Sequence, residues 1–184
     1  MHGLILSELR RFLHARLGEA AWPALVEKAR VGRTTYLISE TYPDAEVVAL
    51  VTTASQITGV PAGALLEDFG EFIVPTLLKT YRAFVKPTWR TLDVLEHTEQ
   101  NIHKAVRLRD AGAEPPRLHV TRPNPDEVQI VYRSERKLCA VAKGIVNGIA
   151  KHYGDAVEVA ESTCMVNGDP ACTINVRAVS LENS

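Results

Sequence analysis

The chain has 184 residues, of which 46% are hydrophobic and 23% charged, and its formal net charge is −1. This length is enough for one domain with a ligand-sized cavity in its core. The near-neutral charge argues against a general nucleic-acid binder, which would carry a basic excess, and no apolar run approaches the roughly 20 residues that span a bilayer.

The N-terminus does not resemble a signal peptide, because Glu8, Arg10 and Arg11 interrupt any apolar segment almost at once. We therefore expect a cytoplasmic protein without a membrane or nucleic-acid partner. In that setting, the three cysteines are expected to be thiols or metal ligands, not a disulfide scaffold.

The first 85 residues predict helices. Residues 2–17 form one amphipathic helix that stops at Gly18, and a second is expected over about 19–29, followed by a loop to Tyr42. A third helix is expected over 44–59, with Asp44 as its cap. Residues 61–85 predict a short and a longer helix, broken near Gly70 and bent or restarted at Pro75.

The next helix is expected from Trp89 to about Asp110 and carries His103 at the edge of its apolar stripe. A histidine in that position is more often a core or boundary residue than a metal ligand. Gly112 is expected to close the helix, and Pro115-Pro116 forces an extended exit.

From there the apolar pattern alternates, as in β-strands. Residues 118–120 and 128–132 predict an antiparallel hairpin, and Ser134 can cap a helix that ends near Gly154. Two further strands are expected over about 156–165 and 171–179, joined at 167–170. This order, with helices first and an antiparallel sheet afterwards, predicts one α+β domain.

Tyr132, Ser134 and Arg136 occupy alternating positions. On a continuous strand, their side chains would point to one side at intervals of roughly 6.6 Å, so that they could bind one anionic group together. The local alternative is a strand end with Ser134 as a helix cap and Arg136 in solvent. An axial nitrogen and anchors for two propionates are what a haem requires, so His103 and this triplet are candidate haem ligands.

These residues resemble the H-NOX family, which are haem-based nitric oxide/oxygen sensors related to the regulatory domain of soluble guanylate cyclase. The resemblance covers essentially the whole chain. It rests on the start Met1-x-Gly3-x-Ile5, on a histidine shortly before Pro115-Pro116-Arg117-Leu118, and on Tyr132-x-Ser134-x-Arg136. It implies a single H-NOX domain over residues 1–184 with a distal helical subdomain (about 1–60), a proximal subdomain with the sheet (about 61–184) and haem b between them.

The same resemblance implies a role for each of these residues. His103 would be the proximal iron ligand, and Tyr132, Ser134 and Arg136 would bind the propionates. Ile5 and Pro116 would press on the porphyrin and keep it non-planar.

The position after the triplet bears on which gas is bound. Oxygen-binding members of the family carry a tyrosine whose hydroxyl donates to bound O₂, and the matching residue here is Val141. Its expected neighbours Leu9, Ile73 and Leu77 also lack donors. Such a hydrogen bond is worth on the order of 1–2 kcal/mol, so we expect NO, and CO more weakly, to bind in preference to O₂.

The resemblance also implies a mechanism and a type of partner. Binding of NO would weaken the bond between iron and His103, and the domain would signal in trans to a histidine kinase or a cyclic-di-GMP enzyme. The chain itself is not expected to be an enzyme.

The cysteines suggest a second, structural metal site. Cys164 and Cys172 lie symmetrically about the turn between the last two strands, and Cys139 lies early in the preceding helix. Zinc favours four such ligands, and a subset of H-NOX domains binds it with three matching cysteines and a histidine. Glu161 stands at the histidine position here, and His152 is another candidate. A redox-sensitive Cys164–Cys172 pair and three ordinary small apolar residues are the alternatives.

Other functions fit the sequence less well. A haem peroxidase needs polar acid/base groups on the distal side, and we find no motif for a zinc hydrolase. The Cys164–Cys172 segment also resembles the hairpin of haem-free ligand-binding domains of the vinyl-reductase type, but His103 and the triplet argue against that assignment. A haem/thiol redox sensor is the remaining alternative.

Overall fold

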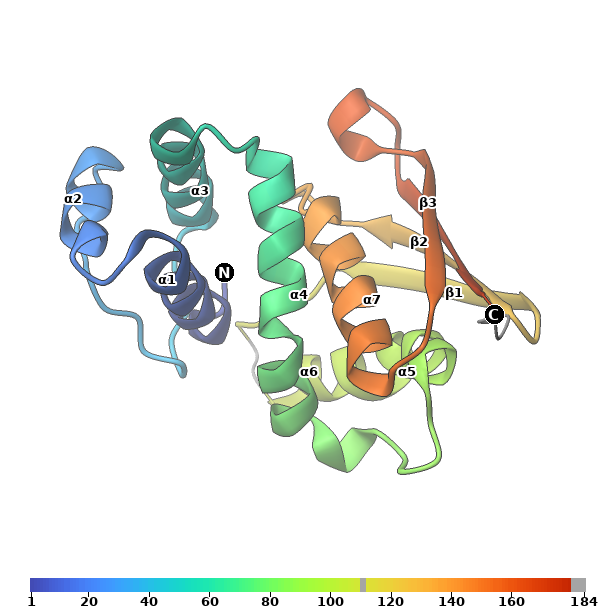
Figure 1. Cartoon of the computed structure of the whole chain (residues 1–184). Helices are drawn as coiled ribbons and strands as arrows, with labels where there is room; N and C mark the ends of the chain where they lie inside the picture. The colour runs from blue at the N-terminus through green and yellow to red at the C-terminus, as the bar shows by residue number, and fades with distance from the viewer. Residues whose placement is uncertain (110–111, 180–184) are drawn as a thin grey trace.

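The computed structural model describes residues 1–109 and 112–179 of the chain. Three helices form one side of the molecule, two long helices cross its centre, and a sheet lies on the other side (Figure 1). The first three helices are α1 (Gly3–Leu17), α2 (Ala21–Lys28) and α3 (Asp44–Thr58). They confirm the helices expected from the leucine spacing and from the stop signals.

The helix ends follow from local chemistry. Gly59 ends α3 in the left-handed conformation, with φ of 71°, which glycine adopts without steric cost. Asp44 and Glu46 lie in the first turn of α3, where their negative charges are favourable near the positive end of the helix dipole.

The predicted break near Gly70 and the predicted restart at Pro75 are wrong. Helix α4 runs without interruption from Ala62 to Thr80, through Gly70 and Pro75, and the short helix η1 (Arg82–Phe84) follows it. Pro75 removes one helical hydrogen bond, but Ile73 and Val74 beside it are each only 1% exposed. We attribute the continuity of α4 to this burial, which outweighs the local helix-breaking tendency.

The helix expected over 89–110 is divided into three segments. They are α5 (Thr91–His97), a π-helix η2 (Thr98–His103) and α6 (Lys104–Arg109). A π-helix places an extra residue in each turn, so it changes the direction in which the following side chains point. His103 is the last residue of this wider turn, and the predicted end at Asp110 falls outside the described residues.

The expected antiparallel sheet is confirmed. Its strands lie in the order β1-β2-β4-β3, and every neighbouring pair is antiparallel. Helix α7 (Cys139–Tyr153) connects β2 to β3, and the short helix η3 (Met165–Asn167) lies between the last two strands. The strand bounds are β1 Arg117–Asn124, β2 Glu127–Arg133, β3 Val157–Thr163 and β4 Cys172–Ala178.

Two apolar cores are joined by α4 and α7. One core fills the space among α1, α2, α3 and the first part of α4. The other lies between the sheet and helices α4, α5 and α7, with Val128, Ile174 and Val176 fully buried. Because α4 and α7 lie side by side between the three N-terminal helices and the sheet (Figure 1), their packing sets how the two cores meet.

Glycines bring α4 and α7 into backbone contact. A Cβ atom on Gly144 would lie 1.9 Å from the carbonyl oxygen of Glu67, and one on Gly70 would lie 2.3 Å from that of Val141. Both distances are far shorter than van der Waals contact, so any side chain at these positions would push the helices apart.

Within the described residues, no single helix is long and apolar enough to cross a membrane. Helices α3 and α4 meet such a criterion only as a pair, with a bend of 111° between them.

We predict that Gly144→Ala lowers the free energy of unfolding by about 1–3 kcal/mol or more, as overpacking does, because the added methyl group meets rigid backbone. Urea titration measures the change. Gly63→Ala in α4 is the matched control, since nothing lies within 4 Å of a Cβ atom added at Gly63. Equal stability of the Gly144→Ala protein and the wild type would contradict this packing.

Candidate haem pocket and cysteine cluster

A cavity of about 250 Å³ lies where the N-terminal helices, α4, α7 and the π-helix converge. Ile5 of α1, Leu77 of α4 and Val141 of α7 contribute to its wall, together with His103 and Pro116. Further apolar side chains of the wall include Val47, Leu66, Phe69, Val74, Leu78, Val94, Ile102, Val106, Ala142, Ile145 and Ile149. The cavity is therefore largely hydrocarbon, with polar groups at a few places, as is usual for cofactor sites.

Most residues expected to contact the cofactor line this cavity. They are His103, Tyr132, Ser134, Arg136, Ile5, Pro116, Leu77 and Val141. Leu9 and Ile73 belong to the core of the N-terminal half, where they are 0% and 1% exposed, and they are not among the lining residues. The structure therefore does not bring those two to the cavity surface.

The triplet reaches the cavity in a different way from the one predicted. Strand β2 ends at Arg133, so only Tyr132 lies on a strand. Ser134 begins a turn in which its carbonyl accepts from the Lys137 amide at 3.0 Å and its Oγ accepts from the Arg136 amide at 3.3 Å. Helix α7 starts only at Cys139, with Leu138 as its N-cap, so the expected cap by Ser134 is wrong. The turn, instead of strand alternation, directs these side chains to one place.

Tyr132 is 3% exposed, and burial raises the pKa of its phenol. The phenol is therefore neutral at physiological pH and can donate a hydrogen bond to an anion.

Arg136 connects three distant parts of the chain beside the cavity. Its Nε donates to Asp44 Oδ2 at 2.8 Å, and its guanidinium also binds the backbone carbonyl of Glu114. The other oxygen of Asp44 lies 2.7 Å from the Met1 amine. Burial by itself would raise the pKa of Asp44, but the interactions with the charged N-terminus and with Arg136 outweigh it, so the pKa is lowered.

His103 is held through its Nδ1 atom, which lies 3.0 Å from Glu99 Oε2. Glu99 also pairs with Arg107 and accepts from the Leu118 amide at 3.2 Å. Burial alone would raise the pKa of Glu99, but the bonds to His103 and Arg107 outweigh it and lower the pKa to about 2. The carboxylate is thus charged at neutral pH, and the imidazole Nε2 remains available as a ligand atom.

Several polar residues of this region were not identified from the sequence, among them His2 and Glu114, which line the cavity. Tyr81, which follows α4, and Thr98, at the start of the π-helix, also line the cavity. Glu99 is another, and its spacing of four residues from His103 is the signal that could have revealed it, because such pairs meet on one face of a helix.

The three cysteines meet at a second site, and none of them lines the cavity. Strand register pairs Thr163 with Thr173, which brings Cys164 opposite Cys172 at the end of the hairpin where the segment connecting β3 to β4 begins. Cys139, at the start of α7, lies with its sulfur 3.6 Å from that of Cys164. This is far longer than the roughly 2.05 Å of a disulfide bond, and all three cysteines are free thiols.

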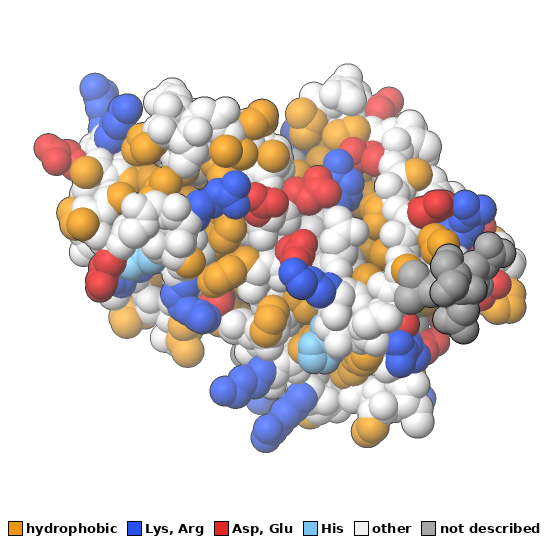
Figure 2. Space-filling view, in the orientation of Figure 1, with side chains coloured by type: hydrophobic (Ala, Val, Ile, Leu, Met, Phe, Trp, Pro, Cys, Tyr) orange, Lys and Arg blue, Asp and Glu red, His pale blue; other side chains and the backbone are white. Residues whose placement is uncertain are grey.

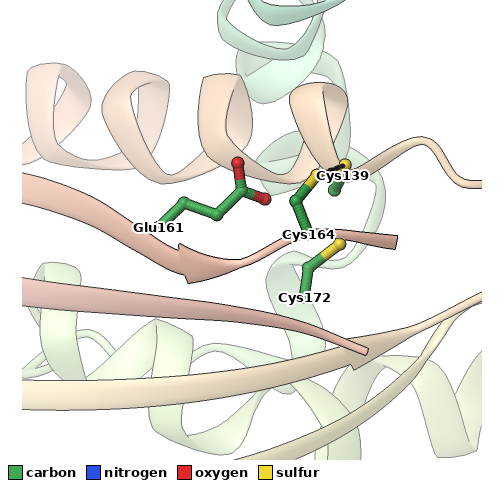
Figure 3. A group of neighbouring side chains, drawn as sticks. All are labelled: Cys139, Glu161, Cys164 and Cys172. Atoms are coloured by element: carbon green, nitrogen blue, oxygen red, sulfur yellow. Dashed lines mark hydrogen bonds between the residues drawn. The ribbon is translucent and has the colours of Figure 1, made fainter. Parts of the chain in front are cut away.

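Glu161 completes a four-residue cluster. One ligand atom from each of Glu161 and the three cysteines lies within 4.8 Å of all the others, and the Glu161 carboxylate is turned toward the sulfurs (Figure 3). One carboxylate oxygen accepts from Lys143 at 3.2 Å, while the other is buried without a hydrogen-bond partner. Burial raises the pKa of the Cys139 and Cys172 thiols. His152 is not in this cluster, and its ring packs edge-to-face against Tyr153.

Known proteins resemble this chain in sequence and in fold. A family model described as "Haem-NO-binding" matches residues 2–161, so the match ends before Cys164 and Cys172. Among curated proteins, the "Soluble guanylate cyclase gcy-31" of Caenorhabditis elegans is 20% identical over 138 residues. That alignment covers 74% of this chain but 20% of the cyclase, so the chain spans about a fifth of that relative's length.

Solved structures share the fold. An H-NOX protein from S. oneidensis in the Fe(II)NO ligation state has a TM-score of 0.90 at 23% identity, and the alignment covers 98% of this chain and 100% of that one. The Fe(II) unliganded H-NOX protein from K. algicida also has a TM-score of 0.90, at 19% identity, with 100% of both chains covered. At these identities the likeness establishes the architecture.

We predict that Asp44→Asn lowers the free energy of unfolding by about 0.5–1 kcal/mol at pH 7, a small value because the carboxylate is half-exposed. Since the pKa of Asp44 is lowered by folding, its contribution is fully present above its unfolded pKa of about 3.9 and is lost as the pH falls through the folded value. Denaturant titrations of both proteins at pH 7 and at pH 3 or below measure this.

The control for that prediction is Asp126→Asn in the exposed hairpin turn, which should leave stability almost unchanged. If Asp44→Asn had no effect at pH 7, or an effect that did not diminish in acid, the bridge from Met1 to Arg136 would not stabilise the fold.

Proposed function

Since the chain belongs to the haem-NO-binding family, we propose that it is a haem-based sensor that selects NO, excludes O₂ and regulates a partner protein in trans. The family binds haem, and its domains are sensors and not enzymes. Bound haem would supply an iron centre for a diatomic gas; the selectivity, the coupling and the partner are proposals about this chain.

The cavity fits haem in its distribution of chemistry. His103 offers an imidazole nitrogen for iron, and Arg136 with Tyr132 and Ser134 offers a cation and hydroxyl groups for the propionates. Ile5 and Pro116 line the same space, as expected of residues that press on a porphyrin. We propose haem b, because the sequence shows no Cys-x-x-Cys-His motif for covalent attachment.

The selectivity for NO rests on the wall at Val141. Its cavity-lining neighbours one turn along α7 and on the facing helices, Ile145, Ile5 and Leu77, have only hydrocarbon side chains. Bound O₂ carries partial negative charge and gains on the order of 1–2 kcal/mol from a hydrogen-bond donor. NO binds ferrous iron strongly without one, and CO more weakly, so a wall without donors favours NO.

The bond between iron and His103 would couple gas binding to conformation. Binding of NO would weaken this bond, and a ligand shifts a conformational equilibrium only through such a difference in affinity between states. His103 lies at the junction of the π-helix and α6, so its release would move that segment. We propose that the distal part, about 1–60, then shifts against the remainder, 61–184, across the Met1–Asp44–Arg136 bridge.

The family resemblance suggests a histidine kinase or a cyclic-di-GMP enzyme as the partner. The distribution of surface charge favours a protein over a nucleic acid as the partner. Acidic and basic side chains are interspersed over the face in Figure 2, with no extended basic area on it.

The cysteine cluster is proposed to hold a structural zinc ion. Three thiolates and one carboxylate satisfy the four-coordinate preference of zinc, and the buried, unpaired oxygen of Glu161 is an available donor. Lys143, bound to the other oxygen, would orient the carboxylate.

The second candidate is a thiol redox sensor. The sequence indicated Cys164 and Cys172 as its pair, whereas the sulfurs of Cys139 and Cys164 lie 3.6 Å apart. These two thiols could form a disulfide if an external oxidant accepted their two electrons and two protons.

We predict that Val141→Tyr creates a stable O₂ complex in air, while the wild-type ferrous protein binds NO and forms no such complex. Absorption spectra of the anaerobic, aerated and NO-treated proteins measure this. Val141→Phe adds the same ring without the hydroxyl and should still exclude O₂. Tyr81→Phe removes the tyrosine that lines the cavity from the end of α4 and should leave gas selectivity unchanged.

Two outcomes would contradict this assignment. A stable oxy complex of the wild type would mean that a donor reaches bound O₂. An oxy complex of both the Val141→Tyr and Val141→Phe proteins would mean that the wall acts by shape and not by hydrogen bonding.

For the cysteine cluster, we predict about one zinc ion per chain after purification without chelator, as a closed four-ligand site requires. Elemental analysis and chelator competition measure it. Cys172→Ser should abolish tight binding, and Glu161→His should tighten it, because imidazole replaces a weaker carboxylate donor. His152→Ala is the control and should retain zinc, since His152 lies outside the cluster. Wild-type protein that neither contains nor takes up zinc would exclude the site.

A further inference from the structure

We propose that Glu99 is the positioning residue of His103: it fixes the orientation of the imidazole, strengthens the bond to iron and connects the ring to the edge of the sheet. This inference rests on the proposed ligation of haem iron by His103. It adds that Glu99 would control how easily the bond between iron and His103 is weakened.

The geometry around Glu99 carries the proposal. One carboxylate oxygen, Oε2, lies 3.0 Å from His103 Nδ1 and 3.2 Å from the Leu118 amide nitrogen. The other oxygen is paired with the guanidinium of Arg107. The side chains of Glu99 and His103 are 19% and 15% exposed, so water competes only weakly for these bonds.

The contact between Glu99 and His103 determines which imidazole nitrogen carries the proton. A carboxylate can only accept, so Nδ1 carries the proton and Nε2 keeps its lone pair for the metal. A carboxylate behind a metal-binding histidine holds the ring in place and raises its basicity, which strengthens the bond to the metal. Arg107 partly neutralises the negative charge of Glu99 and thereby limits the increase in imidazole basicity.

The Leu118 amide extends the connection into the sheet. Strand β1 is an edge strand, so one row of its backbone groups has no neighbouring strand, and Glu99 occupies the amide of Leu118 in that row. Leu118 is the register partner of Tyr132 on β2, and Tyr132 lines the cavity. A short path therefore runs from the proposed iron ligand through Glu99 to the strand that carries a proposed propionate anchor.

The experiment compares wild type with Glu99→Gln, Glu99→Ala and a matched control, Glu96→Gln. Glu96 precedes Glu99 by three residues, and its ion pair, at 3.0 Å, is with Arg122 and not with His103. Resonance Raman spectra of the ferrous, gas-free proteins give the iron–histidine stretching frequency. Hydrogen exchange, followed by NMR, reports the protection of the Leu118 amide.

We expect the iron–histidine frequency to fall in Glu99→Gln, which keeps an uncharged acceptor, and to fall further in Glu99→Ala. Haem dissociation should be about tenfold faster in Glu99→Ala, as for other residues that support a metal ligand. The Leu118 amide should exchange faster in Glu99→Ala, with partial protection in Glu99→Gln. Glu96→Gln should match the wild type in all three measurements.

The outcomes separate this inference from the proposed function. If the wild type shows the iron–histidine band and both Glu99 variants keep its frequency, the role of Glu99 is wrong while haem ligation by His103 stands. If the folded wild type holds no histidine-ligated haem, the proposed function fails and this inference fails with it. Unchanged Leu118 exchange in Glu99→Ala would overturn the connection to the sheet whether or not haem is present.

Discussion

The close approach of α4 and α7 is the constraint on which the rest of the structure depends. Gly70 and Gly144 leave no room for a side chain between the two helices, so backbone meets backbone at the centre of the molecule. This contact joins the core of the N-terminal helices to the core beneath the sheet. It also fixes the cavity, because Leu77 comes from α4 and Val141 from α7. Separation of these helices would change both the stability of the domain and the shape of its pocket.

Within that frame, charged groups are confined to the edges of an apolar cavity and are held in pairs. Arg136 is balanced by Asp44, which also binds the N-terminal amine. His103 is backed by Glu99, whose second oxygen binds Arg107. An ion that enters such a site finds donors already oriented, and little reorganisation is needed. The hydrocarbon wall around Val141 gives the opposite environment, with no hydrogen-bond donor among Val141, Ile145, Ile5 and Leu77.

The sequence predicted the α+β class, the antiparallel sheet and most of the pocket. Apolar periodicity and motif spacing are local patterns, and in these regions tertiary packing does not change the structure that they predict. Prediction from the sequence failed where tertiary packing decides. Burial carries α4 through Pro75, and a π-helix interrupts the helix that ends in His103. Ser134 and Arg136 reach the cavity from a turn and not from a strand face. The spacing of Glu99 from His103 was a local signal that was overlooked, whereas its bond to the Leu118 amide joins residues distant in sequence and could not be predicted from the pattern.

The central claim, that His103 binds the iron of a haem that responds to NO, is tested most directly by the visible absorption spectrum of the ferrous protein. Wild type, purified with haem available, should show a Soret band that shifts on addition of NO and does not change in air before the iron oxidises. His103→Gly should lose the histidine-ligated spectrum and regain it with added imidazole, which can replace the missing side chain. A colourless wild-type protein, or a His103→Gly variant with an unchanged spectrum, would contradict the account.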